Sequence, residues 1–289
     1  MMHRTATTVG RVTSEIARQT AAKSAVWLPL LDELADPHAV VGLAVDAEAS
    51  GWDGFFVWDH IRWREPVQSA ADPWIVLTAV AAATERIRLG PMVTPPARRR
   101  PAKLVRETAT LDQLSGGRLV LGVGIGSDDF GSEYSRFGEE TDSATRAAMT
   151  DETLEILRTA WSGEPVRHQG THHVVDDVTF LPRPVQRPGV PVWIAGFPSK
   201  VRPMRRAALH DGYFPVNLSG PDELADAVAA VQALRDQGAG PFDVAAEVTP
   251  GMDPAPYVAA GATWCLTNFE PHDTTVEHVR GVIKEGPPA

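Results

Sequence analysis

The chain has 289 residues, a formal net charge of −10 and a single cysteine, Cys265. This length is somewhat above the roughly 250 residues that one (β/α)8 barrel needs. The acidic charge disfavours nucleic acid as a partner, and a lone cysteine excludes an internal disulfide, so we expect a reducing, cytoplasmic setting. No run of about 20 apolar residues could cross a membrane, and Met1–Ala22 lacks the apolar stretch of a secretory signal.

Apolar runs alternate with helical patterns along the chain, after a polar N-terminal extension over residues 1–23 that need not be ordered. Strands buried on both faces read as continuous apolar runs, and their alternation with helices is typical of a parallel sheet. Eight such strands are predicted, at Ala25–Leu30, Gly54–Trp58, Ile87–Val93, Leu119–Val123, Val192–Ala195, Gly212–Val216, Asp243–Val248 and Thr263–Asn268. They predict one (β/α)8 TIM barrel over residues 24–289. A doubly wound open sheet is the alternative, but no Gly-x-Gly-x-x-Gly follows the first strand.

Prolines mark the expected helix starts. A proline at the first helical position sacrifices no hydrogen bond, and a preceding Asp can cap the helix. Helices are therefore predicted to begin at Asp36-Pro37, Asp72-Pro73, Arg100-Pro101 and Gly220-Pro221. Gly51 and Gly116 are placed to end the first and third of them.

Two segments fall outside the eight units. Val166–Gln169 and His172–Val175 predict a hairpin before the fifth strand. Ser127–Asp142 is an irregular excursion after the fourth strand, where a barrel carries its active site. Gly126, Gly131 and Gly138 would let this excursion move as a lid.

Asp59 and His60 follow the second strand directly. Residues just beyond the carboxyl ends of barrel strands are the default catalytic candidates. His60 can exchange a proton near neutral pH, and Asp59 could orient it. The alternative is structural: Asp59 caps the loop and His60 packs beside Trp63.

Two loops after strands offer backbone amides to a ligand. Glycines allow a phosphate or a ring edge to approach the main chain closely, although they also permit tight packing within a barrel. The candidates are Gly124, Gly126 and Ser127 after the fourth strand and Ala195, Gly196, Phe197 and Ser199 after the fifth. Ser199 is expected near a helix N-terminus, a natural phosphate site.

Other motifs leave alternatives open or exclude a chemistry. Pro91 lies within the third strand run and predicts a bulge there. Arg98-Arg99-Arg100 is either a solvated loop or an anion site near a cofactor tail. His172 and His173 are adjacent, so their side chains fall on opposite faces of a strand and do not make a metal site. No phosphate-binding loop, nucleophile elbow or Cys-x-x-Cys occurs.

The longer motifs resemble the luciferase-like flavin or deazaflavin oxidoreductases. The match is strong over about residues 25–216 and weaker beyond. It is carried by Gly51-Trp52-Asp53-Gly54-Phe55-Phe56-Val57-Trp58-Asp59-His60, by Thr84-Glu85-Arg86-Ile87-Arg88-Leu89-Gly90 with Val93-Thr94-Pro95, by Leu111-Asp112-Gln113-Leu114-Ser115-Gly116-Gly117-Arg118 with Gly122-Val123-Gly124, and by Pro191-Val192-Trp193-Ile194-Ala195-Gly196.

The resemblance implies a flavin lying across the carboxyl ends of the strands. His60 would then be a proton donor or substrate-orienting group near the reactive edge of the ring, with Asp59 bordering the ring. Met92, Val93 and Thr94 would lie under the ring, with a cis peptide between Met92 and Val93. The residues from Gly124 to Ser127 and from Gly196 to Ser199 would hold the ribityl and phosphate groups. One departure stands out: deazaflavin-dependent sugar-phosphate dehydrogenases of the superfamily carry a glutamate where this chain has Ser127.

On this basis the expected function is a luciferase-like monooxygenase that uses reduced FMN on a small organic substrate. The alternatives are a deazaflavin-dependent reductase or dehydrogenase, a non-catalytic flavin-binding protein and a metal-dependent hydrolase. Trp58, Trp63, Trp74 and Phe197 could wall an apolar substrate pocket, although Trp74 can instead pack within its helix. We expect a homodimer through the helices at Ile75–Ala83 and Leu104–Leu114, a flavin reductase as a further partner, and no bound metal.

Overall fold

The computed structural model describes residues 22–236, 238–272 and 274–288. Most of the expected extension, residues 1–21, therefore lies outside the described residues. The first strand begins at Lys23, one residue inside that expected extension.

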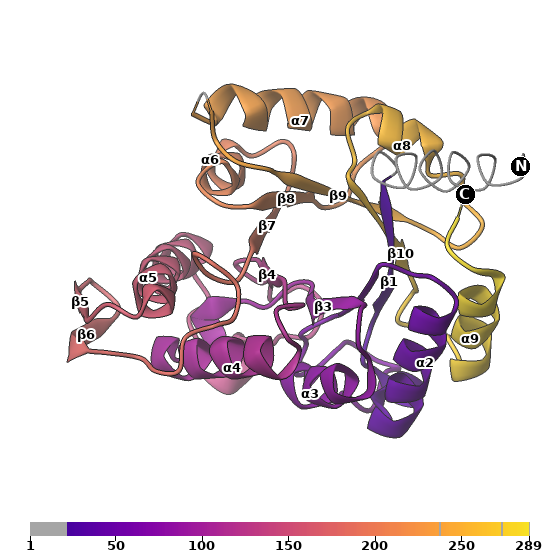
Figure 1. Cartoon of the computed structure of the whole chain (residues 1–289), viewed down its shortest axis with the longest axis horizontal. Coiled ribbons are helices and arrows are strands. Elements are labelled where there is room, and N and C mark those ends of the chain that lie inside the picture. Colours follow the sequence, from indigo (N-terminus) through magenta and orange to yellow (C-terminus); the bar gives the residue numbers. More distant parts are fainter. Residues whose placement is uncertain (1–21, 237, 273, 289) are drawn as a thin grey trace, which may run out of the picture.

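Eight parallel strands form a barrel in the order β3-β2-β1-β10-β9-β8-β7-β4 (Figure 1). Two bridges, Leu89 to Leu119 and Thr94 to Val123, join β3 to β4 and close the ring. The TIM barrel and all eight predicted strands are thus confirmed. The strands are β1 (Lys23–Leu28), β2 (Gly54–Val57), β3 (Arg88–Pro91), β4 (Leu121–Val123), β7 (Val192–Gly196), β8 (Gly212–Pro215), β9 (Asp243–Val248) and β10 (Trp264–Asn268).

Helices surround the barrel (Figure 1). They are α2 (Pro37–Ala49), α3 (Pro73–Ala83), α4 (Pro101–Leu114), α5 (Ser143–Ser162), α6 (Val201–Ala208), α7 (Pro221–Leu234), α8 (Ala255–Ala259) and α9 (Val276–Glu285), with 3-10 turns η1 (Asp32–Ala35), η2 (Pro96–Arg98) and η3 (Ser135–Phe137). The four helix starts predicted at prolines are confirmed. The carboxylate of Asp72 accepts the N–H groups of Trp74 and Ile75, as expected of an N-cap.

The core has an inner and an outer layer because strand side chains alternate between faces. Phe56 of β2 points into the barrel, where it packs with Trp193 and Trp264. Its neighbours Phe55 and Val57 belong to the apolar layer between the strands and the helices. The barrel is therefore filled by aromatic side chains, and ligands are left to its rim.

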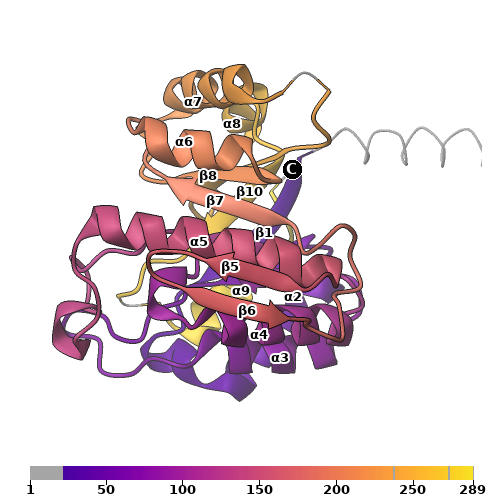
Figure 2. The same ribbon diagram turned by 90° about the vertical axis from the view of Figure 1, so that its left-hand side faces the viewer.

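The predicted hairpin is present outside α5 (Figure 2), with its second strand displaced. Its strands are β5 (Val166–Gln169) and β6 (Val174–Val178), so the prediction of His172–Val175 for the second strand starts two residues too early. Glu152 of α5 explains the difference, because its carboxylate accepts the N–H groups of Thr171, His172 and His173 and fixes them as the turn.

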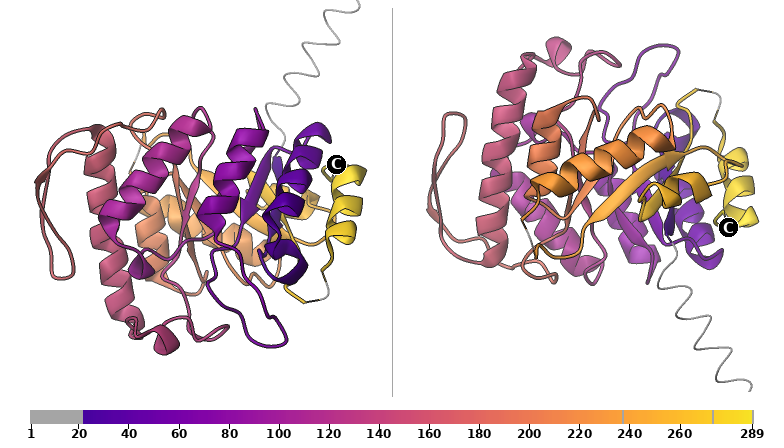
Figure 3. Two further views of the ribbon diagram at one scale, coloured as in Figure 1. Left: turned by 90° about the horizontal axis from the view of Figure 1, so that it is seen from below. Right: turned by 90° about the horizontal axis from the view of Figure 1, so that it is seen from above.

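The loop after β2 and the segment after β4 extend from the same end of the barrel (Figure 3). This is the end where the parallel strands have their carboxyl termini. Among the described residues, every helix is too short or too polar to span a bilayer.

Candidate active site at the barrel rim

Asp59 is buried at the end of β2 and is held by two arginines. Its carboxylate accepts hydrogen bonds from Arg99 Nη2 at 2.6 Å, Arg98 Nη2 at 3.2 Å and Thr94 Oγ1 at 2.5 Å. Only 3% of Asp59 is exposed, so these two cations offset the cost of burying its charge. None of these bonds goes to His60. The prediction that Asp59 orients His60 is therefore wrong, and Asp59 anchors the loop to η2.

Glu133, from the excursion after β4, is the group that holds His60. Its Oε2 lies 2.7 Å from His60 Nδ1, and its Oε1 accepts Arg98 Nη1 and the N–H of Ile61, each at 2.6 Å. Sequence reasoning missed Glu133, because the residue lies in an irregular loop with no periodicity and reaches His60 only through the fold.

These contacts decide the charge of Glu133 and the position of a hydrogen on His60. Burial by itself would raise the pKa of Glu133, but the hydrogen bond from His60, the Arg98 charge and the Ile61 N–H outweigh it and lower the pKa. An ionised Glu133 can only accept, so the His60 Nδ1 position must carry a hydrogen. The other ring nitrogen, Nε2, is then left for a ligand. The His60 side chain is 24% exposed, which makes such an approach possible.

Aromatic rings surround His60. Trp63 packs edge-on against the imidazole with 4.7 Å between centroids, and Trp58 lies 5.7 Å away. Phe130 of the excursion stacks on Trp63. The predicted packing of His60 beside Trp63 is therefore present together with the hydrogen bond to Glu133. Trp74 is buried in the outer core, so it does not wall a pocket.

The peptide bond between Met92 and Val93 is cis, as the family resemblance implies. Met92 is buried and its carbonyl accepts Trp27 Nε1 at 2.7 Å, while Thr94 is enclosed and bonded to Asp59. Val93 is half-buried. Of these three predicted cofactor residues, Val93 is therefore the one whose side chain can meet a ligand.

A glycine on β3 and one directly after β4 let these two segments approach each other. A Cβ on Gly90 would lie 1.8 Å from the carbonyl oxygen of Val120, and one on Gly124 would lie 2.7 Å from Val93 Cγ2. The contact at Gly124 supports the packing alternative for this predicted cofactor residue. Gly126 has φ +71°, and a Cβ there would meet the Tyr134 hydroxyl. Ser127 is half-buried and donates to Asp129 at 2.7 Å.

The end of β7 presents small or exposed residues next to a helix start. Ala195 and Gly196 are half-buried, and Phe197 and Ser199 are exposed. Ser199 lies two residues before α6, whose first turn has no side-chain cap. The N–H groups of Val201 and Arg202 can therefore donate hydrogen bonds to a phosphate. Gly196 is also required by packing, since a Cβ there would lie 2.2 Å from Pro203 Cβ.

The basic cluster divides between two roles. Arg98 and Arg99 pair with Asp59 and Glu133, so neither the solvated loop nor a free anion site describes them. Arg100 is exposed. No group of three or more His, Cys, Asp or Glu side chains suited to a metal ion occurs among the described residues.

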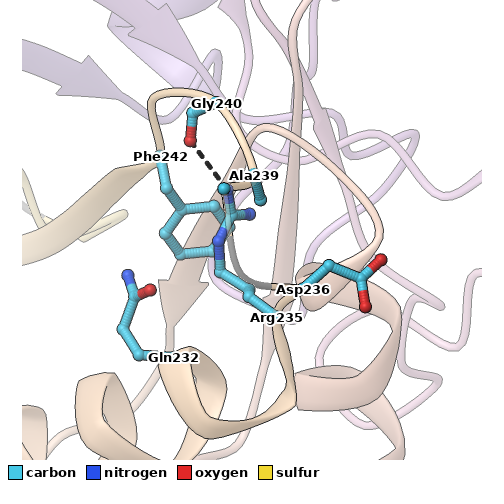
Figure 4. Close-up of a pocket in the computed structure, with 7 residues that line it drawn as sticks. Gln232, Arg235, Asp236, Ala239, Gly240 and Phe242 are labelled. Carbon is cyan, nitrogen blue, oxygen red and sulfur yellow. Dashed lines mark hydrogen bonds between the residues drawn. The ribbon is translucent and has the colours of Figure 1, made fainter.

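A surface depression elsewhere has no connection with this site. It lies where β9 begins, at the opposite end of the barrel, and Gln232, Arg235, Asp236 and Phe242 are among the residues that line it (Figure 4). Arg235 is already engaged, since it donates to the Gly240 carbonyl at 2.9 Å and lies over the Phe242 ring. A small cavity of about 210 Å³ lies nearer His60, under the loop from Ile61 to Ala70.

The fold is that of a (β/α)8-barrel protein, and its candidate site is a partly exposed histidine at the carboxyl ends of the strands. Comparison with known sequences identifies the family: residues 11–262 match the luciferase-like monooxygenase family, and the chain belongs to it. It is accordingly a luciferase-like oxidoreductase.

A curated relative is described as an F420-dependent glucose-6-phosphate dehydrogenase from Mycobacterium avium (strain 104). It is 33% identical over 232 residues, which cover 77% of this chain and 67% of the relative. Other relatives with the same description are matched over 47% to 74% of their length.

Two solved structures share the fold. A coenzyme F420 dependent tetrahydromethanopterin reductase from Methanopyrus kandleri superposes with a TM-score of 0.72 at 18% identity, covering 92% of this chain and 98% of that one. The oxygenating constituent of 3,6-diketocamphane monooxygenase from Pseudomonas putida, in complex with FMN, gives a TM-score of 0.66 at 19% identity, covering 81% and 68%.

Proposed function

We propose that this chain is a deazaflavin-dependent oxidoreductase that exchanges a hydride between coenzyme F420 and a carbon bearing a hydroxyl or carbonyl group. The observation that carries the proposal is the His60–Glu133 pair, which leaves Nε2 of a rim histidine available for proton transfer. The relatives at 32–35% identity are described as F420-dependent, and this favours the deazaflavin over the FMN expected at first.

The residues at the rim fit such a coenzyme. Val93 provides a partly exposed apolar support, and Ala195 and Gly196 are too small to block a flat ring. The uncapped first turn of α6, next to Ser199, suits a phosphate. Gly126 and Ser127 would contact the ring or its ribityl chain. When bound, the coenzyme supplies the carbon that accepts or returns a hydride.

His60 would remove the proton of a substrate hydroxyl at Nε2 as the hydride departs, and return it in the reverse direction. Glu133 would hold the imidazole in the required tautomer and stabilise its protonated form. Trp58 and Trp63 would keep water away from the exchanging proton, with Phe130 covering Trp63. Because Ser127 stands where the sugar-phosphate dehydrogenases carry a glutamate, glucose 6-phosphate is not proposed as the substrate.

Binding of F420 and of FMN to the purified chain, by fluorescence titration side by side, tests the coenzyme. We expect preference for F420. Preference for FMN would instead support the monooxygenase function, for which the FMN-containing structural neighbour is the present argument and a flavin reductase would be the partner. If the chain binds neither F420 nor FMN, both the deazaflavin-dependent and the monooxygenase functions are contradicted. A homodimer remains a prediction in either case.

His60→Ala tests the proton transfer. We expect F420 affinity to be retained and turnover of an alcohol panel to fall by about 10²–10⁴-fold, the usual contribution of general acid–base catalysis. The matched control is His38→Ala, because His38 is exposed on α2. Full turnover in His60→Ala would contradict the assignment.

A further inference from the structure

A second polar pair faces the barrel mouth, formed by Glu247 of β9 and Asn268 of β10. Glu247 lies two residues after Ala245, and Asn268 two residues after Leu266; both of these apolar residues belong to the inner core. Because side chains alternate along a strand, Glu247 and Asn268 share that inward face. They are at the carboxyl ends of their strands, and so above the aromatic filling of the barrel.

The pair is bonded internally and leaves an oxygen unused. Asn268 Nδ2 donates to Glu247 Oε1 at 2.7 Å. Asn268 is 8% exposed, and its Oδ1 is buried with no hydrogen-bond partner among the described residues. A buried acceptor without a donor costs free energy, so such an atom at a ligand-binding rim suggests that a ligand supplies the missing hydrogen bond.

Glu247 also lacks the cations that the other rim carboxylates have. Burial raises its pKa, the Asn268 hydrogen bond opposes the rise, and the charge of Glu270 adds to it. No ion pair with Glu247 is found in the described part of the chain, whereas Asp59 and Glu133 are paired with Arg98 or Arg99. This side of the mouth therefore accepts hydrogen bonds and carries uncompensated negative charge.

The pair is continuous with the proposed proton-transfer site. Asn268 is in register with Trp27 of β1, and Trp27 lies 5.5 Å from Trp58 between ring centroids. Trp58 in turn contacts His60. The arc of β9, β10, β1 and β2 thus has the Glu247–Asn268 pair at one end, tryptophans in the middle and His60 at the other end. The proposed coenzyme residues follow β3, β4 and β7, on the other half of the ring.

We propose that Glu247 and Asn268 form a substrate subsite that accepts hydrogen bonds from hydroxyl groups and selects a neutral hydroxylated substrate over a phosphorylated one. The inference rests on the proposed function for the location of the substrate. Hydroxyl groups donate to Asn268 Oδ1 and to the Glu247 carboxylate, while a phosphate offers only acceptors and is repelled.

The experiment is calorimetric titration of the F420-loaded chain at pH 8 with glycerol, cyclohexanol, glucose and glucose 6-phosphate. We expect at least one neutral probe to bind, and glucose to bind about tenfold more tightly than its phosphate, since an unmet charged hydrogen bond costs at least that factor. Glu247→Gln keeps the shape and removes the charge, so it should abolish the discrimination. Asn268→Ala should weaken glucose binding about fivefold or more.

The matched control is Glu277→Gln, because Glu277 is an exposed carboxylate in the first turn of α9 and is not among the groups that shift the pKa of Glu247. It should leave the preference unchanged. Tighter binding of glucose 6-phosphate, no binding of any neutral probe, or an unchanged preference in Glu247→Gln would overturn the subsite. Loss of F420 binding itself, followed by coenzyme fluorescence in the same samples, would instead overturn the proposed function.

Discussion

Two carboxylate sites on one rim are treated differently by the fold. At the His60 site, Asp59 and Glu133 are almost fully buried, and both are neutralised by Arg98, with Arg99 adding to Asp59. At the Glu247 site, the carboxylate is only partly buried and has one neutral partner, Asn268.

This difference distinguishes a carboxylate that supports the structure from one that can bind a ligand. A carboxylate that is paired and hydrogen-bonded on all sides fixes a loop and a neighbouring side chain, but has nothing left for a ligand. A carboxylate without a cation is a poor source of stability and a good acceptor for a donor brought from outside. Substitutions at the two sites should therefore differ in size, and in the sign of their pH dependence.

The largest effect is expected from Arg98→Met. It leaves Asp59 with one arginine instead of two and Glu133 with no arginine, so the free energy of unfolding should fall by about 3–5 kcal/mol. Urea denaturation at pH 7 measures it. Arg100→Met is the control, because Arg100 is exposed and should change stability by about 0.5 kcal/mol at most. A loss for Arg98→Met no larger than the control's would mean that the His60 site is not charge-compensated as described.

Glu133→Gln should cost about 2 kcal/mol at pH 7, because it replaces charged hydrogen bonds to His60, Ile61 and Arg98. The pKa of Glu133 is lowered from its ordinary 4.5, so its ionised form stabilises the fold above pH 4.5. That stability is lost as pH falls through the lowered pKa, and the gap between wild type and variant should close there. Urea titrations from pH 7 to pH 3 measure the gap, with Glu139→Gln, an exposed neighbour, as control. A gap that widens on acidification would contradict the pairing.

Thr94→Val distinguishes two roles for a residue predicted to bind the cofactor. Its hydroxyl donates to Asp59 and accepts from Arg99 Nε at 2.9 Å, so we expect a loss of about 1 kcal/mol in the chain without coenzyme. Denaturation with and without F420 separates support of Asp59 from contact with the ring. Thr110→Val, exposed on α4, is the control. Unchanged stability together with weaker F420 binding would instead support the prediction that Thr94 contacts the cofactor.

The smallest effect, and the opposite sign, is expected for Glu247→Gln. Because the pKa of Glu247 is raised from its ordinary 4.5, the fold favours its protonated form. Stability contributed by that proton is present below pH 4.5 and is lost as pH rises through the raised pKa. The free energy of unfolding of the variant should therefore rise relative to that of the wild type between pH 4.5 and pH 8. The rise should be about 1 kcal/mol or less, because the residue is partly solvated. A loss that grows with pH, as for Glu133→Gln, would show that Glu247 is a paired structural carboxylate.

The barrel could be predicted from local composition, because strands buried on both faces are continuous apolar runs and prolines mark the helix starts. The eight strands and the placement of His60 at the carboxyl end of β2 follow from it. The cis peptide bond between Met92 and Val93 could also be predicted, through the family resemblance. The start of the second hairpin strand was harder to predict, because Glu152 of α5 fixes the turn that precedes it.

Which polar side chains come together could be learned only from the folded chain. Glu133 reaches His60 across 73 residues, and Arg98 joins it from η2; no local pattern encodes either distance. The opposite pKa shifts of Glu133 and Glu247 could not be predicted either, because they depend on whether a cation lies beside each carboxylate after folding. Strand positions follow from local patterns along the chain, whereas the pairing of charges depends on contacts between residues that are distant in the sequence.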